Sequence, residues 1–114
     1  MKRLIVIVVT GSLLLLGTAC SKNIYHWGQY ENSIYRMHKK TADYNNQAEI
    51  EILVREIEKT LTKGLLVPPG LYMHVGYLVS LEGDKEEALK YFELEKVNFP
   101  ESATFVDGIG ARLK

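Results

Sequence analysis

Residues 69–100 have the sequence PGLYMHVGYLVSLEGDKEEALKYFELEKVNFP, which divides into two helices at Gly83. The first, at about 71–82, is apolar on nearly every side, which is typical of a helix buried on more than one face. Asp84 is a good N-terminal cap for the second helix, with a glutamate three residues further on. Pro100 ends the second helix. The stretch therefore predicts a helical hairpin.

The spacing within this hairpin is similar to that of one tetratricopeptide repeat (TPR), a helix-turn-helix unit of about 34 residues. Gly76 stands where the two helices of such a unit approach closely, and Ala88 and Phe92 stand where the second helix packs on the first. Three positions depart from the usual tryptophan, tyrosine and second alanine, namely Tyr72, Val79 and Glu95. A generic helical hairpin would show the same small residues and the same capped turn.

Repeat units of this kind bury their apolar faces against neighbours, and stable arrays generally need three or more units. The other helices of this chain, or another protein, must therefore cover the unit. Met73, Tyr77 and Leu81 form a stripe at helical spacing, on the side that faces inward in such repeats and holds partners. The simpler alternative is that this stripe packs against the helix predicted at 46–63.

Three further helices are predicted from apolar periodicity, at about 27–40, 46–63 and 100–113. The helix at 46–63 has the clearest apolar stripe, which consists of Ile50, Leu53, Val54, Ile57 and Leu61. No segment of the mature chain alternates polar and apolar residues as a strand would. We expect residues 25–114 to form an all-α domain of four to five helices that contains the TPR-like unit.

The N-terminus has the three parts of an export signal. Lys2 and Arg3 are basic, and residues 4–16 form an apolar run of about 13 residues, shorter than the roughly 20 that cross a bilayer. Small residues follow at 17–19. We expect residues 1–19 to be a cleaved signal peptide.

Cys20 is the only cysteine of the chain, so it has no partner for an internal disulfide. The segment LGTAC at 16–20 resembles the bacterial lipobox, in which the cysteine is lipidated and becomes the new N-terminus; an ordinary secretory signal is the alternative. Two or more acyl chains anchor a protein stably. We expect residues 20–24 to be a lipidated tether, and Ser21 favours the outer membrane, with the domain facing the periplasm.

The composition argues against several classes of function. Removing Lys2 and Arg3 leaves 12 basic against 14 acidic side chains, a net charge of −2, so we expect no nucleic-acid binding.

His26, His38 and His74 lack ligand spacing to one another or to the cysteine, so we expect neither a metal nor a cofactor. No serine lies in a nucleophile elbow, and we expect no enzyme. We place four glutamates on the exposed face of their helix: Glu86, Glu87, Glu93 and Glu95.

Motifs along the whole mature chain resemble one family of small bacterial lipoproteins of unknown function. They include YHWGQYE at 25–31, VPPG at 67–70 and FPES at 99–102. Members of that family look like companions of a CsgG-like, curli-secretion-type lipoprotein and of another small lipoprotein. The resemblance implies a subunit of an envelope lipoprotein complex, and it brings no catalytic residues.

These observations favour a lipid-anchored adaptor that binds other envelope lipoproteins. We assign lipidation to Cys20 and partner binding to Met73, Tyr77, Leu81 and Trp27. One alternative is a carrier of a small apolar ligand or lipid that uses the same helix as a pocket wall. Another is a purely structural envelope lipoprotein whose helices bury all their apolar surface internally.

Overall fold

The computed structural model describes residues 24–114, so the predicted signal peptide, the lipidation site Cys20 and the tether as far as Asn23 lie outside the described residues. The described chain folds into five α-helices and one short 3-10 helix: α2 (Tyr30–Lys39), α3 (Asn46–Thr62), α4 (Leu71–Leu81), α5 (Lys85–Asn98), η2 (Pro100–Ser102) and α6 (Ala103–Gly110). Within this part of the chain, β pairing is limited to an isolated bridge between Tyr25 and Leu66. The predicted all-α fold is confirmed.

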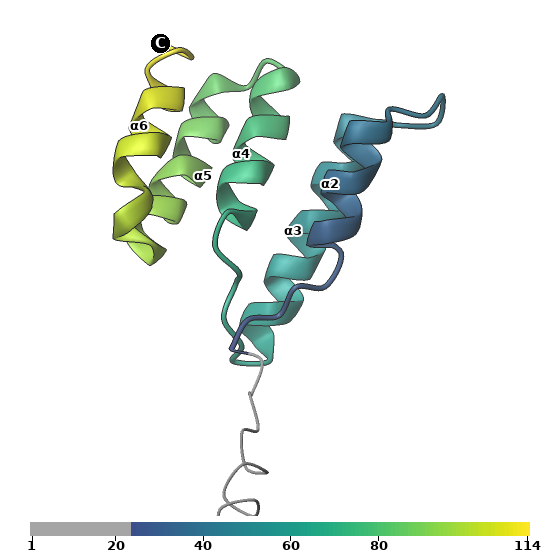
Figure 1. Cartoon of the computed structure of the whole chain (residues 1–114), viewed down its shortest axis with the longest axis horizontal. Coiled ribbons are helices and arrows are strands. Elements are labelled where there is room, and N and C mark those ends of the chain that lie inside the picture. Colours follow the sequence, from purple (N-terminus) through teal and green to yellow (C-terminus); the bar gives the residue numbers. More distant parts are fainter. Residues whose placement is uncertain (1–23) are drawn as a thin grey trace, which may run out of the picture.

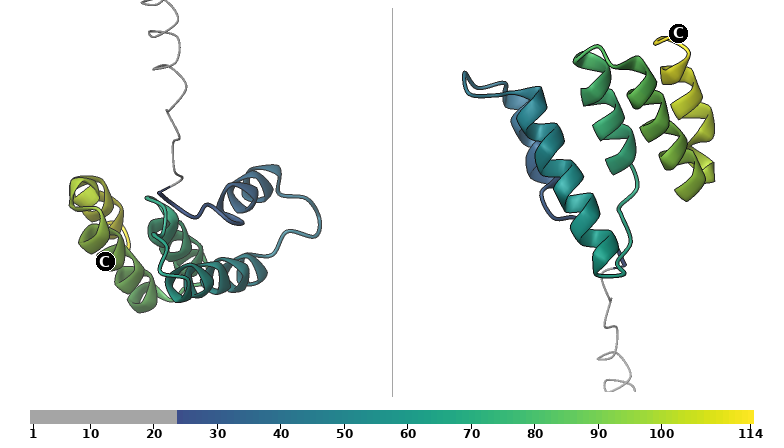
Figure 2. Two further views of the ribbon diagram at one scale, coloured as in Figure 1. Left: turned by 90° about the horizontal axis from the view of Figure 1, so that it is seen from below. Right: turned by 180° about the vertical axis from the view of Figure 1, so that it is seen from behind.

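The helices lie side by side in chain order from α3 to α6, and α2 lies beside α3 (Figure 1). Seen end-on, they form two staggered layers, with α2, α4 and α6 in one and α3 and α5 in the other (Figure 2, left). Helices adjacent in the chain therefore alternate between layers. The helices α2, α4 and α6 of the first layer all contribute to one open apolar surface.

The core lies between α4 and its two neighbours. Most residues of α4 are buried, which confirms the expectation from its apolar sequence. The core cluster consists of Leu53, Ile57, Val67, Leu71, Tyr72, Val75, Leu78, Val79 and Ala88. Fully burying one such side chain contributes about 1.5–3 kcal/mol, so these contacts hold α3, α4 and α5 together. The predicted apolar stripe of α3 ends early, because its last member, Leu61, is 56% exposed.

The hairpin predicted at 69–100 is present as α4 and α5. A Cβ atom added at Gly76 would lie 2.7 Å from Phe92 Cε1 and 3.0 Å from the carbonyl oxygen of Ala88. Only glycine permits this close approach of the two helices. Gly83 has φ +92° in the turn, and Asp84 caps α5 by accepting a hydrogen bond from the Glu87 N–H at 3.0 Å.

Two helix boundaries differ from the prediction. α2 begins at Tyr30 rather than Trp27, because Gly28 has φ +46° and the Tyr30 N–H closes a turn on the Trp27 carbonyl instead. α6 ends at Gly110, and the last residues form looser turns. The boundaries of α3, α4 and α5 agree with the prediction to within a residue.

No helix in residues 24–114 has both the length and the apolar character required to span a membrane.

Candidate functional site

The apolar stripe on α4 lies open. Tyr77 is 41% exposed and Leu81 is 51% exposed, while Met73 is half-buried. Whatever part of the stripe α3 covers, about half of the Tyr77 and Leu81 side chains stays exposed. α3 contacts α4 through Leu53 and Ile57, which belong to the core cluster.

A mostly apolar hollow of about 390 Å³ lies at the N-terminal half of α4. All three helices of the first layer line it. Tyr30 comes from α2, Met73 and Tyr77 come from α4, and Phe105 and Ile109 come from α6, with Gly70 and His74 completing the lining. Phe105 is 65% exposed, so an aromatic ring stands free at one wall.

A second hollow, of about 430 Å³, lies at the C-terminal half of α4. Its walls are more polar, and the lining comprises Met37, His38, Lys40, Thr41, Tyr44, Asn46, Tyr77 and Leu81. Tyr77 borders both hollows, and we call the two hollows together the α4 groove. The Tyr44 hydroxyl in its wall is buried and has no hydrogen-bond partner among the described residues.

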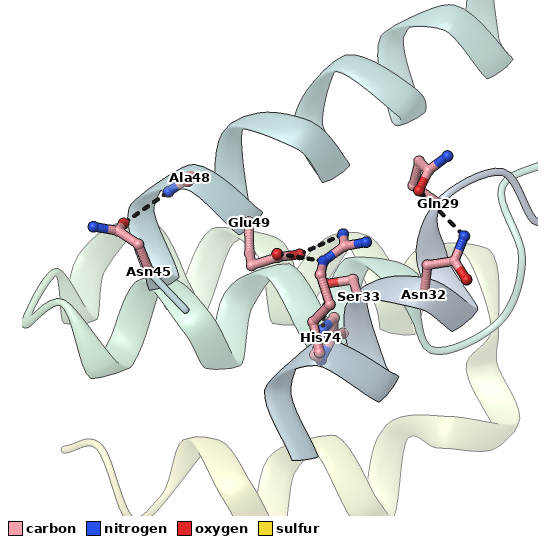
Figure 3. A network of polar contacts seen from close by, with 8 residues as sticks. Gln29, Asn32, Ser33, Asn45, Ala48, Glu49 and His74 are labelled. Atoms are coloured by element: carbon pink, nitrogen blue, oxygen red, sulfur yellow. Dashed lines mark hydrogen bonds and ion pairs between the residues drawn. The ribbon is translucent and has the colours of Figure 1, made fainter. Parts of the chain in front are cut away.

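A buried polar network holds the wall formed by α2 in place (Figure 3). The Arg36 guanidinium donates two hydrogen bonds to the Glu49 carboxylate, at 2.6 and 2.8 Å, and so joins α2 to α3. Ser33 Oγ lies 3.4 Å from His74 Nε2 and joins α2 to α4. This network positions Tyr30, whose ring lies 5.7 Å from that of His74.

The charges of this network follow from its contacts. The hydrogen bonds from Arg36 hold the pKa of Glu49 below its usual value, against the effect of burial. Burial lowers the pKa of His74, although the charge of Glu49 opposes the shift. Glu49 is therefore an anion at neutral pH, and His74 is a neutral imidazole. The network is part-buried, since Ser33 is fully buried and Glu49 is only 6% exposed, whereas the Arg36 side chain is 38% exposed.

One glutamate that we expected on the exposed face of α5 is buried. Glu95 is 2% exposed, and its carboxylate accepts hydrogen bonds from the N–H groups of Gly70 and Met73, at 2.7 and 3.3 Å. These donors lie at the start of α4, where backbone N–H groups have no partner within the helix. The expectation is wrong because α5 supplies the cap that α4 itself lacks. Burial raises the pKa of Glu95, and the two backbone hydrogen bonds oppose the shift.

Trp27 lies outside the lining of the α4 groove. Its ring is stacked on that of Tyr30, with centroids 6.1 Å apart and planes 3° from parallel. On its other side it borders a hollow of about 280 Å³ that Tyr25, His26 and Leu65 also line. The structure therefore brings Met73, Tyr77 and Leu81 together in one groove and places Trp27 at a different surface.

Several residues of the α4 groove were not predicted from the sequence. Phe105 and Ile109 are four residues apart on α6, and this spacing was the available signal. Within residues 24–114, no group of three or more histidine, cysteine, aspartate or glutamate side chains lies close enough to hold a metal ion. His26 lies 3.4 Å from Glu56, and His74 contacts Ser33.

The chain belongs to the family described as a domain of unknown function (DUF4810), whose profile matches residues 24–109. The match includes α2 to α5 and nearly all of α6, and with them every residue that lines the first hollow. No curated protein and no solved structure is significantly similar to the chain.

Proposed function

We propose that this DUF4810 protein is a lipid-anchored adaptor of the cell envelope that holds a segment of a partner lipoprotein in the α4 groove. The observation that carries the proposal is the open stripe of Met73, Tyr77 and Leu81 between the walls formed by α2 and α6. The partner class comes from the sequence resemblance, which implies a complex with a CsgG-like secretion-type lipoprotein.

The composition of the groove supports a protein partner. Aromatic residues and methionine are enriched at protein–protein interfaces, and the groove presents Tyr77, Phe105 and Met73 on a rigid helical frame. From Met73 to Leu81 the stripe extends about 12 Å along α4, at 1.5 Å per residue. An extended peptide covers that length with about four residues.

The two ends of the groove favour different side chains of the partner. The hollow beside Met73 and Phe105 accepts apolar side chains. The hollow beside Leu81 is lined by His38 and by the cationic Lys40, which suits a carboxylate. We therefore propose a partner segment with apolar residues at one end and an acidic residue at the other.

A carried lipid fits the groove less well than a protein segment. A carrier shields apolar ligands from water, and its pockets bury most of the ligand surface. The side chains at the rim of the α4 groove, Tyr77, Leu81 and Phe105, are themselves about half exposed. An acyl chain in this groove would stay in contact with water, whereas a partner protein would cover both the groove and its own segment.

The anchor is the second part of the proposal. The lipobox-like segment at 16–20 and the lone Cys20 support lipidation, and Ser21 supports retention at the outer membrane. The domain would face the periplasm, where other envelope lipoproteins are within reach. No catalytic residue, cofactor or metal is part of the proposed function.

The groove is tested by affinity purification of the full chain from bacterial envelopes, comparing wild type with Tyr77→Glu and Met73→Glu. We expect the charged variants to lose a partner lipoprotein that wild type retains, because a carboxylate in the groove would be desolvated by the bound segment. Leu94→Glu is the matched control, since Leu94 is 42% exposed on α5 and Tyr77 is 41% exposed. Equal recovery of the same partners with all four proteins would refute the groove proposal.

The anchor is tested separately by metabolic labelling with palmitate. Wild type should incorporate the label, and Cys20→Ala should incorporate none. Equal labelling of the two proteins, or no labelling of either, would defeat the anchor without affecting the groove.

A further inference from the structure

The described chain begins beside the C-terminal end of α3 (Figure 1), and several exposed apolar residues belong to these two segments. We call them the basal patch, which consists of Ile24, Trp27, Leu61, Leu65 and Leu66. Their exposed fractions are 65%, 41%, 56%, 41% and 54%. Connections are usually polar, yet the connection after α3 presents two leucines to solvent.

The two segments of the basal patch are joined by direct contacts. Tyr25 forms the isolated parallel bridge with Leu66, and the His26 N–H donates to the Leu66 carbonyl at 3.1 Å. Trp27 and Leu65 line the same hollow. The connection folds back on the end of α3, where the Leu65 N–H donates to the Thr60 carbonyl at 3.0 Å.

Aromatic packing fixes Trp27 in this position. The Tyr25 ring meets the Trp27 ring edge-on at 6.3 Å and the Phe99 ring at 6.2 Å, while Trp27 stacks on Tyr30. Such pairs each contribute about 0.5–1.5 kcal/mol beyond the burial of their area. These contacts hold the Trp27 ring in one position, in which 41% of the residue is exposed to solvent.

The position of the basal patch in the chain indicates what covers it. Ile24 follows Cys20 by four residues, so even a fully extended chain places Ile24 within about 14 Å of the cysteine. A lipid on Cys20 would hold that cysteine at the membrane surface, so the basal patch cannot lie far from the headgroups. Tryptophan and tyrosine are enriched at this level of a membrane.

The charges around the basal patch do not require an anionic membrane. Lys59 and Lys63 lie beside Glu56 and Glu58 at the end of α3, and Lys59 is paired with Glu56 at 3.3 Å. The surface is therefore close to neutral. Burial of apolar area, rather than attraction to anionic lipid, would drive its contact with a bilayer.

We propose that the basal patch lies in the interfacial layer of the leaflet that carries the lipid on Cys20. This inference rests on the proposed lipid anchor. Membrane contact at the basal patch fixes the orientation of the domain, because the long helices run away from this end (Figure 1). The end of the α4 groove at Leu81 then points away from the membrane, whereas the end at Tyr30 lies next to Trp27. The anchor and the basal patch together act as two points of attachment.

Trp27 itself reports on this contact, because it is the only tryptophan in the chain. We would reconstitute the mature lipidated protein into vesicles of phosphatidylcholine and phosphatidylethanolamine that contain lipids with a nitroxide near the headgroup. We expect the Trp27 emission to shift to shorter wavelength and to be quenched by these lipids, since indole rings lie at headgroup level in membranes. Emission that nitroxide lipids leave unchanged would overturn the inference.

Two variants show whether the basal patch causes the quenching. Leu66→Ser should reduce it, whereas Leu81→Ser should not, because Leu81 is equally exposed but lies at the far end of α4. Equal quenching in both variants would contradict a role for the patch. A blue shift that depends on protein concentration and not on nitroxide lipid would assign the patch to a second copy of the chain.

The same preparation separates this inference from the proposed function. If the protein incorporates palmitate but the Trp27 emission is not quenched, the proposed membrane contact of the basal patch is refuted, while the proposed lipid-anchored adaptor is unaffected. If the protein incorporates no palmitate, the anchor itself fails, and the basis of this inference fails with it.

Discussion

Glu95 shows how one residue links the core to the α4 groove. α4 begins after Gly70, which has no side chain to cap the helix, and its first turn contains no acidic residue. The carboxylate of Glu95 reaches across from α5 and accepts from Gly70 and Met73. Gly70 and Met73 both line the first hollow. By accepting their hydrogen bonds, Glu95 holds the backbone of this part of the groove in place.

Replacement of Glu95 by alanine should destabilise the domain. Glu95→Ala leaves two N–H donors without their acceptor, so we expect the free energy of unfolding to fall by about 1–3 kcal/mol. Urea denaturation of the mature Cys20→Ala chain measures the loss. Glu93→Ala is the control, because the Glu93 side chain is 67% exposed and its ion pair with Lys96 is a surface pair that contributes little to stability. Equal losses in the two variants would argue against the capping role.

Glu49 should make the domain sensitive to acid. Its pKa is lowered in the folded state, so its stabilising contribution is fully present above the unfolded value of about 4.5 and is lost as the pH falls through the folded pKa. Glu49→Gln removes this contribution. The difference in unfolding free energy between wild type and Glu49→Gln should therefore be constant well above pH 4.5 and should shrink as the pH falls below that value. Glu95 has a raised pKa and acts with the opposite sign, but it is present in both proteins. A constant difference would contradict the Arg36–Glu49 account.

At the scale of elements, the packing of α4 on α5 depends on one glycine. Alanine is a better helix former than glycine by about 1 kcal/mol, so Gly76→Ala would stabilise an unconstrained helix. Here the new methyl group meets Phe92 and the backbone of Ala88. We expect a net loss of about 1–3 kcal/mol from this overpacking, measured by thermal or urea unfolding.

Gly108 provides the opposite case within the same domain. It lies in α6, and a Cβ added there meets no atom within 4 Å. Gly108→Ala should therefore gain about 0.5–1 kcal/mol from helix propensity. If both alanine variants lower the free energy of unfolding, or both raise it, then the space around each glycine does not determine the sign of the change in stability.

Local patterns in the sequence predicted most of the elements. Asp84 and Pro100 mark the ends of α5 by local chemistry, and the apolar character of α4 reports its burial on several sides. The stripe of Met73, Tyr77 and Leu81 followed from helical spacing alone. Gly28 moved the start of α2, because its positive φ is a backbone conformation that periodicity does not reveal.

Contacts between distant segments could not be predicted in this way. Phe105 and Tyr30 share the groove only because α6, which packs on α5, and α2, which packs on α3, lie on the same side of α4. Glu95 resembles any surface glutamate until its helix is placed against the start of α4. The Arg36–Glu49 pair and the Ser33–His74 contact likewise depend on three helices meeting. Each of these features is a tertiary contact with no local signature.

In the whole molecule, we propose that the basal patch contacts the membrane and that the α4 groove binds a partner protein. The basal patch lies where the described chain begins, close in sequence to Cys20. The α4 groove is lined mainly by residues of α2, α4 and α6 and carries Met73, Tyr77 and Leu81, which we propose for partner binding. Attachment at one surface leaves the other free, as an adaptor at a membrane requires.

The central claim is that the α4 groove holds a partner protein in the envelope. It is tested most directly by a photo-crosslinking amino acid in place of Tyr77 in living cells, with the same substitution at Leu94 as the control. We expect a covalent adduct with one envelope lipoprotein at position 77, none at position 94, and loss of the adduct in the Cys20→Ala background. Crosslinking that is absent at position 77, or equal at the two positions, would contradict the claim.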